Sequence, residues 1–244
     1  MKAIILAAGY ATRLYPLTKE YPKPLLMVRQ KPIIGYILDK MAQIKEIEEI
    51  VVVTNSKFFP KFKDWQRHLE IKKPISVLDD LTKDNAHRLG AVGDMGFAIG
   101  EKNIKDDLLV VGGDNLFDGD LRDFLAFAGM HKANPAIGAY NIRIKSKAVR
   151  YGVLKIDRKN KVVDFQEKPE KPKSTLVAMC LYYFPAKRLG LIKEYLKENK
   201  RFDATGSYID WLREKVAVYG YIFSGSWYDI GDHKFYNEAK GKFK

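Results

Sequence analysis

The chain has 244 residues, of which 46% are hydrophobic, 30% charged and 12% aromatic, and its formal net charge is +13 at pH 7. This hydrophobic and aromatic content excludes an intrinsically disordered chain and is enough to form the core of one domain. The single cysteine, Cys180, excludes an internal disulfide and, with 4 scattered histidines, leaves no zinc cluster to assemble. We therefore expect a reducing cytoplasmic location.

The sequence predicts neither a membrane segment nor a nucleic-acid groove. No apolar run approaches the length that a membrane-spanning helix needs. Residues 3–8 imitate the start of a secretory signal, but the apolar run stops there and Arg13 follows. Lysines are spread along the whole length without a dense basic block or a base-stacking motif. We predict a buried first strand, no membrane or nucleic-acid partner, and a solvated cationic surface.

Short β-rich runs alternate with helical patterns in the first half of the chain. This alternation implies crossover connections and a parallel sheet with helices on both faces, which is a doubly wound α/β unit over residues 1–130. We expect Pro32 to occupy the first turn of its helix. The expected elements are strands over residues 2–6, 49–54, 75–78 and 107–111, and helices over residues 32–44, 58–69 and a weak, glycine-rich segment that runs from 90 towards 99.

The second half has closely spaced strands, so we expect mixed or antiparallel strands to join the sheet. A hairpin turn is expected over residues 158–161. No internal repeat, low-complexity tract or long linker is evident, and the sequence therefore predicts one domain over residues 1–244. The expected elements are strands over residues 136–142, 151–156, 162–167, 176–184 and 218–223, and helices over residues 121–130, 186–198, 208–216 and from 233 onward.

The segment after the first strand contains the residues most informative about function. Small residues and Gly9 end the strand, so backbone amides can approach a ligand closely and cradle oxyanions. Arg13 offers a planar fork for phosphate oxygens, and Lys23 is a positive charge mounted stiffly between two prolines. The alternative interpretation is a strand-end loop with surface cations. The phosphate-loop motif G-x-x-x-x-G-K-[ST] and the dinucleotide motif G-x-G-x-x-G are both absent, which argues against a P-loop ATPase or an NAD enzyme.

The sequence L-A-A-G-Y-A-T-R-L-Y-P-L-T from Leu6, followed by P-K-P-L-L from Pro22, resembles the signature of sugar-phosphate nucleotidyltransferases. These enzymes are the nucleoside-diphosphate-sugar pyrophosphorylases, such as glucose-1-phosphate thymidylyl- and uridylyltransferases. Four later segments resemble further family motifs, in family order and almost to the end of the chain. They are Gly113-Asp114-Asn115, Tyr151-Gly152-Val153, Glu167-Lys168-Pro169 and Trp227-Tyr228-Asp229-Ile230-Gly231.

This resemblance implies a Rossmann-like, doubly wound α/β fold with a mostly parallel mixed sheet, helices on both faces and an added strand-rich, sugar-phosphate-binding half over residues 131–244. It also implies transfer of a nucleoside monophosphate from a nucleoside triphosphate to a sugar 1-phosphate, with release of pyrophosphate, by Mg²⁺-dependent in-line attack. An aspartate at the carboxyl end of a central parallel strand lies where open α/β sheets bind ligands. Magnesium bridging phosphate oxygens would make a pair of carboxylates favourable there.

The resemblance assigns roles to particular residues. Catalytic roles fall on Arg13, Lys23 and Asp114, and the metal is expected on Asp114 and Asp229. The residues expected to bind the nucleotide are Leu6, Ala7, Ala8, Gly9, Thr12, Arg13, Lys23 and Gly113. The residues expected to bind the sugar phosphate are Tyr151, Gly152, Glu167 and Lys168.

Four departures from the family pattern bear on specificity. Ala11 replaces a loop glycine, and Cys180 replaces a glycine in the family's A-x-x-G-I-Y strand, where a side chain would shape or shrink the sugar pocket. Asp232 replaces a threonine or serine, adding negative charge near the metal unless it caps the last helix. The family's base-reading G-x-A-x-A is not evident in residues 85–94, so the base stays undecided.

Three other functions remain open from the sequence. Related families use the same loop in cytidylyltransferases for choline phosphate or inositol phosphate. A regulatory subunit that binds nucleotide or sugar without catalysis is a second alternative, and a polyanion-binding module that uses the cationic surface is a third. The sequence does not decide between a monomer and a homo-oligomer.

Overall fold

The computed structural model describes residues 1–131, 133–198 and 205–243. Its centre is a sheet in which β1 (Lys2–Leu6) lies between β4 (Glu49–Thr54) and β6 (Leu108–Gly112) and is parallel to both. Next to β4 lies β5 (Ile75–Asp79), again parallel. β1, β4 and β6 consist mostly of β-branched and leucine side chains that are buried on both faces, the pattern of a covered parallel sheet, whereas β5 at the edge is only partly buried.

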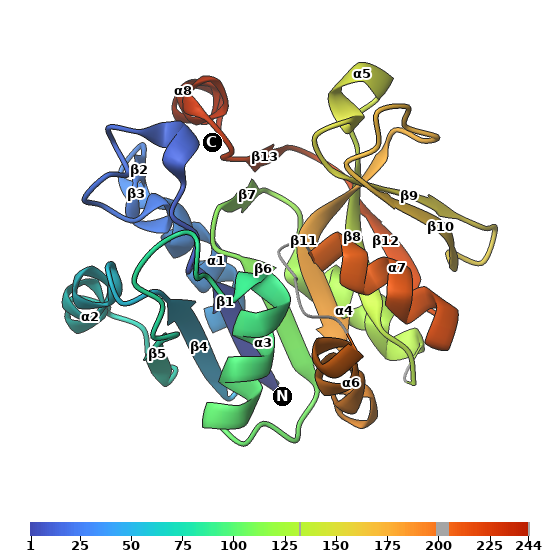
Figure 1. Ribbon diagram of the computed structural model, residues 1–244, viewed down its shortest axis with the longest axis horizontal. Coiled ribbons are helices and arrows are strands. Elements are labelled where there is room, and N and C mark those ends of the chain that lie inside the picture. The colour runs from blue at the N-terminus through green and yellow to red at the C-terminus, as the bar shows by residue number, and fades with distance from the viewer. Residues whose placement is uncertain (132, 199–204, 244) are drawn as a thin grey trace.

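Strand alternation sends neighbouring side chains of β1 into two different cores. Ala3 and Ile5 pack on one face and Ile4 on the other. Three helices contribute buried residues to the first core, and three others to the second. The first set is α1 (Ile33–Ala42), α2 (Phe59–Arg67) and α4 (Leu121–Met130); the second is α3 (Gly90–Glu101), α6 (Gly190–Glu198) and α7 (Thr205–Lys215). The expected α/β fold with helices on both faces is confirmed (Figure 1).

Strands from the second half extend the sheet beyond β6. The full order is β10-β9-β11-β6-β1-β4-β5, and β8 pairs with both β11 and β12. β11 is antiparallel to β6, β8 and β9, whereas β12 is parallel to β8, so the sheet is mixed as expected. The four added strands besides β11 (Leu176–Phe184) are β8 (Ala136–Asn141), β9 (Gly152–Ile156), β10 (Val162–Glu167) and β12 (Tyr219–Phe223). The predicted hairpin turn joins β9 to β10, which are antiparallel.

Several expected boundaries are corrected by the structure. Pro32 adopts extended backbone as the residue before α1 and does not form its first turn. The helix expected over residues 186–198 is divided into a 3-10 turn, Ala186–Arg188, and α6, and α7 begins at Thr205, ahead of residue 208. None of the described helices is long and apolar enough to cross a membrane.

Short elements that the sequence did not predict gather at the carboxyl ends of the central strands. The most consequential is the pairing of β7 (Asn115–Phe117) with β13 (Trp227–Asp229), two strands far apart in sequence. The C-terminal helix α8 (His233–Lys242), which the sequence did predict from residue 233, follows soon after β13. The other short elements are the 3-10 turns Thr12–Leu14 and Lys23–Leu25, the strands β2 (Met27–Val28) and β3 (Lys31–Pro32), and α5 (Lys145–Ala148).

The central position of β1 yields a stability prediction. Ile5 is fully buried in the first core, so Ile5→Ala should lower the free energy of unfolding by about 2–5 kcal/mol through lost apolar burial and the cavity left behind. Ile222, on β12, is 47% exposed, and Ile222→Ala should change stability by less than about 1 kcal/mol. Denaturant unfolding followed by circular dichroism measures both. Equal effects of the two substitutions would contradict this view of the core.

Candidate active site

The turn after β1 is held open by backbone and side-chain contacts from neighbouring segments. Asn55 donates a 2.8 Å hydrogen bond from Nδ2 to the carbonyl oxygen of Ala8. Thr18 donates from Oγ1 to the carbonyl oxygen of Ala11, also at 2.8 Å. Ala11, which replaces a family glycine, has φ 48° and thus adopts the left-handed conformation that glycine favours. The loop therefore keeps a left-handed backbone at residue 11 although alanine stands there in place of glycine, and this conformation is strained for alanine.

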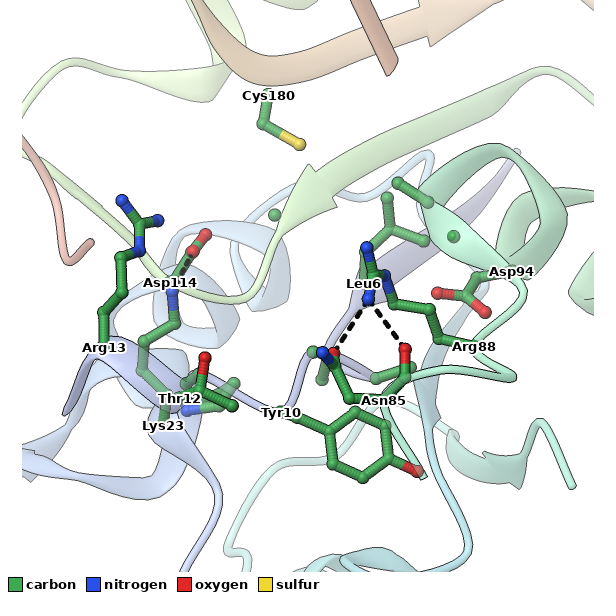
Figure 2. A pocket seen from close by; sticks show the side chains of 18 residues that line it. Leu6, Tyr10, Thr12, Arg13, Lys23, Asn85, Arg88, Asp94, Asp114 and Cys180 are labelled. Atoms are coloured by element: carbon green, nitrogen blue, oxygen red, sulfur yellow. Dashed lines mark hydrogen bonds and ion pairs between the residues drawn. The ribbon is translucent and has the colours of Figure 1, made fainter. Parts of the chain in front are cut away.

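A cavity of about 420 Å³, called here the nucleotide-side cavity, opens beside this turn. Figure 2 shows Thr12, Arg13, Lys23 and Asp114 at one end of it. Gly113 does not line the cavity among the described residues; its backbone amide donates a 2.8 Å hydrogen bond to the Leu6 carbonyl and ties the end of β6 to that of β1. The lining residues that the sequence assigned to the nucleotide are Leu6, Ala7, Ala8, Gly9, Thr12, Arg13 and Lys23.

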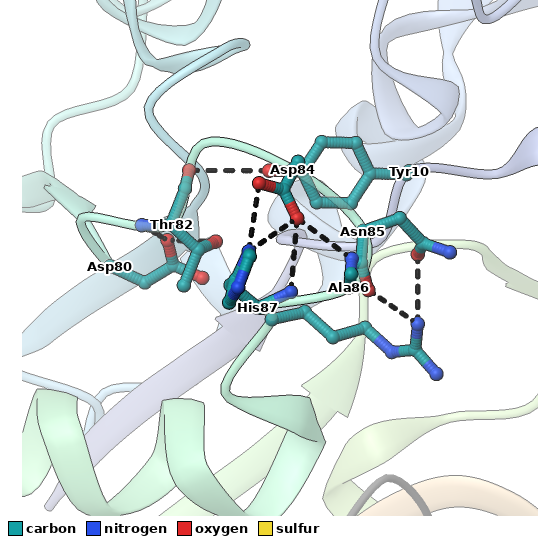
Figure 3. Close-up of polar contacts among 8 residues, drawn as sticks. Tyr10, Asp80, Thr82, Asp84, Asn85, Ala86 and His87 are labelled. Atoms are coloured by element: carbon teal, nitrogen blue, oxygen red, sulfur yellow. Dashed lines mark hydrogen bonds and ion pairs between the residues drawn. The ribbon is translucent and has the colours of Figure 1, made fainter.

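The opposite end of the nucleotide-side cavity contains residues that the sequence did not single out. Arg88 donates from Nη1 to the backbone oxygen of Asn85 at 2.7 Å and to its Oδ1 at 3.0 Å (Figure 2). Asp84 fixes the same loop, because its Oδ1 accepts from the backbone amides of Ala86 and His87 (Figure 3). This loop has no hydrophobic period from which its conformation could be predicted. The one sequence signal for its residues was that residues 85–94 depart from the family's base-reading pattern. The further lining residues at this end are Tyr10, Asn85, Arg88, Gly90, Ala91 and Asp94.

Two carboxylates and one ammonium meet at the end of β6. The β7–β13 pairing sets Asp229 opposite Asn115, directly beside Asp114. Lys23 donates from Nζ to Oδ2 of Asp114 and, at 2.9 Å, to the carbonyl oxygen of Ile230. Burial, together with the negative charge of Asp114, raises the pKa of Asp229 to about 6. The predicted pair is therefore brought together, and its ionised form needs a compensating positive charge.

The donor set fits a magnesium ion shared with a substrate. Magnesium typically uses one or two protein carboxylates and completes its octahedron with phosphate oxygens and waters. Asp114 and Asp229 supply two carboxylates, and no group of three or more acidic, histidine or cysteine ligands occurs among residues 1–131, 133–198 and 205–243. A cage made of protein ligands alone is thus absent from the described chain, and the site suits a cation that arrives with triphosphate.

A second cavity of about 310 Å³, called here the acceptor-side cavity, adjoins the carboxylates. The sequence-predicted sugar-phosphate residues Tyr151, Gly152, Glu167 and Lys168 all line it, together with Asp114 and Asp229. Lys168 lies 3.3 Å from Glu167, measured from Nζ to Oε1. Trp227 forms another wall and donates from its indole nitrogen to Oδ1 of Asn115 at 2.7 Å. The structure therefore gathers this predicted group around one space.

Cys180 stands where the two cavities meet and lines both. Its φ of 53° is again that of the glycine it replaces, and the pairing of β11 with β8 shifts register around it, between Ala178 and Tyr182. Burial, reinforced by the charge of Asp114, raises the pKa of the Cys180 thiol to about 12, so the group is neutral at physiological pH. A neutral side chain therefore contributes to the lining of both cavities.

Asp232 does not join the carboxylate pair. Its Oδ1 accepts a 3.1 Å hydrogen bond from the backbone amide of Phe235 and caps α8. Its Oδ2 pairs with Nη2 of Arg150 at 2.6 Å. Of the two possibilities that the sequence left open for Asp232, the structure shows the cap of the last helix.

Comparisons with known proteins identify the family of the chain. A family model described as nucleotidyl transferase matches residues 2–244, and the chain belongs to that family. The bifunctional protein GlmU of Methanocaldococcus jannaschii is 31% identical over 237 residues, which cover 95% of this chain and 51% of the relative. The chain thus spans about half the length of such archaeal GlmU relatives.

Two further comparisons cover more of the matched protein. The glucose-1-phosphate thymidylyltransferase of Neisseria meningitidis is 29% identical over 249 residues, with 98% of this chain and 81% of that protein covered. A crystal structure from Bacillus anthracis, described as a candidate glucose-1-phosphate thymidylyltransferase in complex with a sucrose, superposes with a TM-score of 0.81. It is 25% identical and covers 99% of this chain and 94% of that chain. The Rossmann-like fold is confirmed by this likeness.

The acceptor-side cavity yields a packing prediction at Gly206, on α7. A Cβ atom there would overlap Oε2 of Glu167 and approach Phe165 to 2.9 Å. Gly206→Ala should therefore displace the Glu167 carboxylate, lower stability by about 1–3 kcal/mol and weaken sugar 1-phosphate binding. Thermal unfolding and calorimetric titration measure the two effects. Gly190→Ala, at the start of α6, is the matched control because a Cβ there meets nothing within 4 Å. Unaltered binding in Gly206→Ala would contradict the expected role of Glu167 in binding the sugar phosphate.

Proposed function

We propose that this protein transfers a nucleoside monophosphate from a nucleoside triphosphate to the phosphate of a sugar 1-phosphate. The observation that carries the proposal is the junction of the two cavities, where Asp114 lines both and Lys23, Arg13 and Asp229 surround it. A triphosphate in one cavity and an acceptor in the other would bring their phosphates together at this point. Membership of the nucleotidyl transferase family supports the same reaction.

The reaction needs positioning and charge neutralisation more than a protein nucleophile. An oxygen of the acceptor phosphate, already an anion, forms a bond to the α-phosphorus, while the bond from that phosphorus to the bridging oxygen breaks. The electron pair leaves with pyrophosphate. Arg13 lies over Gly231, close to Asp229, and in our proposal it neutralises the departing pyrophosphate while Lys23 contacts the reacting phosphates. Mg²⁺, held by Asp114 and Asp229, would cover the negative charge of the triphosphate.

The acceptor is held by polar groups of the second cavity in this proposal. Glu167 can accept hydrogen bonds from two sugar hydroxyls, and Lys168 can neutralise the acceptor phosphate. Gly152 lets the Phe165 ring pack closely beside Glu167, because a Cβ there would lie 2.5 Å from that ring and 3.3 Å from Oε2 of Glu167. The backbone groups of Leu6, Ala8 and Gly9 would face the nucleotide, in keeping with the open space around Gly9, where a Cβ meets nothing within 4 Å.

One feature favours choline phosphate as a second candidate acceptor. Tyr151 and Trp227 stand with ring centroids 5.3 Å apart on the wall of the acceptor-side cavity, near Glu167 and Asp229. Aromatic faces with a nearby carboxylate are the usual environment for a quaternary ammonium group. A cytidylyltransferase acting on choline phosphate is therefore the alternative within the enzyme class.

Pyrophosphate release from five triphosphates, each paired with sugar 1-phosphates, choline phosphate and inositol phosphate, tests the proposal. We expect turnover with a sugar 1-phosphate. Turnover confined to CTP and choline or inositol phosphate would establish the alternative. Absence of turnover with every pair, despite nucleotide or sugar binding, would indicate a regulatory subunit, and salt-sensitive retention of unrelated DNA alone would indicate a polyanion-binding module. Cytoplasmic location and the absence of nucleic-acid and membrane partners stay predictions.

The carboxylate pair yields a second test. Asp114→Asn removes a negative charge while keeping side-chain size, so the fold should survive while turnover falls by at least about two decades, or about 2.7 kcal/mol of barrier stabilisation. Asp229→Asn should behave similarly because Asp232 is engaged elsewhere. Chelation of divalent ions should abolish wild-type activity. Steady-state rates with melting curves check all three; a wild-type rate in either variant at saturating Mg²⁺ would refute the two-carboxylate site.

The base is read, we propose, by the loop that contains Asn85 and Arg88. Asn85 and Arg88 both line the nucleotide-side cavity, and amide and guanidinium groups are of the kind that can hydrogen-bond to a base. Arg88→Ala should change the ranking of the five triphosphates by about tenfold or more, since a lost charge-assisted hydrogen bond costs about 1.5–3 kcal/mol. The Michaelis constant of the acceptor should stay the same. An unchanged ranking would place base recognition elsewhere.

A further inference from the structure

A third cavity of about 280 Å³, called here the cationic cavity, flanks the other two, and more cations than carboxylates line it. Among the residues that the structure describes, three positively charged side chains and one carboxylate line it. This excess of positive charge suits an anion with several oxygens, such as a phosphate group. The lining residues are Arg13, Arg150, Tyr151, Lys168, Asp229, Gly231 and Phe235. Of the three cations, Arg150 was assigned no role by the sequence.

We propose that Arg150 is a phosphate-binding residue for the acceptor substrate, and that Asp232 and Phe235 position it. This inference rests on the proposed function, in which the acceptor contributes the attacking phosphate. The geometry around Arg150 carries it.

Arg150 is fixed at two points by the start of α8. Its Nη2 pairs with Oδ2 of Asp232 at 2.6 Å, and its guanidinium carbon lies 5.0 Å from the centre of the Phe235 ring. A free arginine side chain would lose much conformational freedom on binding a ligand, and this prior restraint reduces that loss. Asp232 itself is held by the 3.1 Å hydrogen bond from the Phe235 amide. The end of the chain therefore supports a cation beside Asp229.

The lining of the cavities assigns Arg150 to the acceptor. Arg150 and Lys168 line both the acceptor-side cavity and the cationic cavity, whereas Lys23 lines the nucleotide-side cavity. Neither Arg150 nor Lys168 is among the described residues that line the nucleotide-side cavity. A phosphate placed between Arg150 and Lys168 would thus belong to the molecule in the acceptor-side cavity.

Asp232 orients the guanidinium without occupying all of its donors. A guanidinium has five N–H groups, and the pair with Asp232 engages Nη2. Among the described residues, the lining of the cationic cavity includes Arg150 but not Asp232, so the carboxylate holds the group from outside the cavity. The other donors remain available to phosphate oxygens. Lys168, in contrast, already lies beside Glu167, and a second cation helps to balance the charge of the acceptor.

This arrangement also accounts for the departure at residue 232. A serine or threonine there would still cap α8, but its neutral hydroxyl would form no ion pair with a guanidinium. The aspartate performs both tasks, as its two oxygens show. The substitution Asp232→Ser should therefore keep the cap of α8 and remove the ion pair with Arg150.

The first arm of the test compares Arg150→Ala, Arg150→Lys and Arg150→Gln in steady-state assays. We expect Arg150→Ala to raise the Michaelis constant of the acceptor by about tenfold or more, the effect of one lost charge-assisted contact, and to change that of the triphosphate by less than about twofold. Arg150→Lys should recover part of the loss because it keeps the charge but not the planar fork. Arg150→Gln should not recover it. Arg158→Ala, an exposed substitution in the β9–β10 turn, removes the same charge and should change neither constant.

The second arm tests the positioning role. Asp232→Ser should keep the melting temperature near that of the wild type and raise the Michaelis constant of the acceptor by about threefold to tenfold. Combined with Arg150→Ala, it should add nothing further, because the effect of Asp232 passes through Arg150. Additive effects of the two substitutions would overturn the positioning role. An unchanged acceptor constant in Arg150→Ala would overturn the assignment of Arg150.

The wild-type enzyme separates this inference from the proposed function. Turnover by the wild type, with no effect of Arg150→Ala on the acceptor, refutes only the role of Arg150. If the wild type turns over no pair, the proposed function fails, and calorimetric titration of inorganic phosphate then decides the present inference. Weaker phosphate binding by Arg150→Ala than by Arg158→Ala would support the anion site, and equal binding by these two variants would refute it.

Discussion

The mutual repulsion of Asp114 and Asp229 is the constraint on which the arrangement of the site depends. Two carboxylates at one strand end repel each other unless a positive charge lies nearby, and the raised pKa of Asp229 reflects its burial first and this repulsion second. Lys23 supplies one such charge, and its second hydrogen bond, to the carbonyl of Ile230, joins the P-K-P-L-L segment to β13. A single ammonium group thereby links three segments that are distant in sequence.

The remaining architecture delivers these groups to one edge of the sheet. Parallel strands β1 and β6 end side by side, so the turn after Leu6 and the segment after Gly112 open onto the same space. β11 lies antiparallel beside β6 and reaches the same edge, where its Cys180 lines both cavities. Left-handed backbone at Ala11 and Cys180 shows that the loop and bulge keep shapes suited to glycine even where a side chain is present.

Sequence patterns predicted the central strands well and the short contacts of the site poorly. β1, β4, β10, β11 and α4 have the predicted bounds, because β-branched runs and amphipathic periodicity are local signals. The three-residue strands β7 and β13 are too short to give such a signal, and each forms by pairing with the other. The Arg150–Asp232 pair spans 82 positions, and the base-side loop has no period, so neither could be derived from spacing. The resemblance to family motifs assigned the expected site residues, whereas Arg88 and Arg150 could be singled out only from the cavities that the fold creates.

The β7–β13 pairing has a consequence for the order in which the protein matures during synthesis. Residues of β1, β4, β5 and β6 leave the ribosome first and pair with one another in parallel, whereas α6 and α7, which cover one face of these strands, are synthesised later. Asp114 emerges with these strands, but its partner carboxylate and the strand that seats it arrive only with residues 227–229. A nascent chain therefore carries Asp114 long before the strand that places Asp229 beside it has been synthesised.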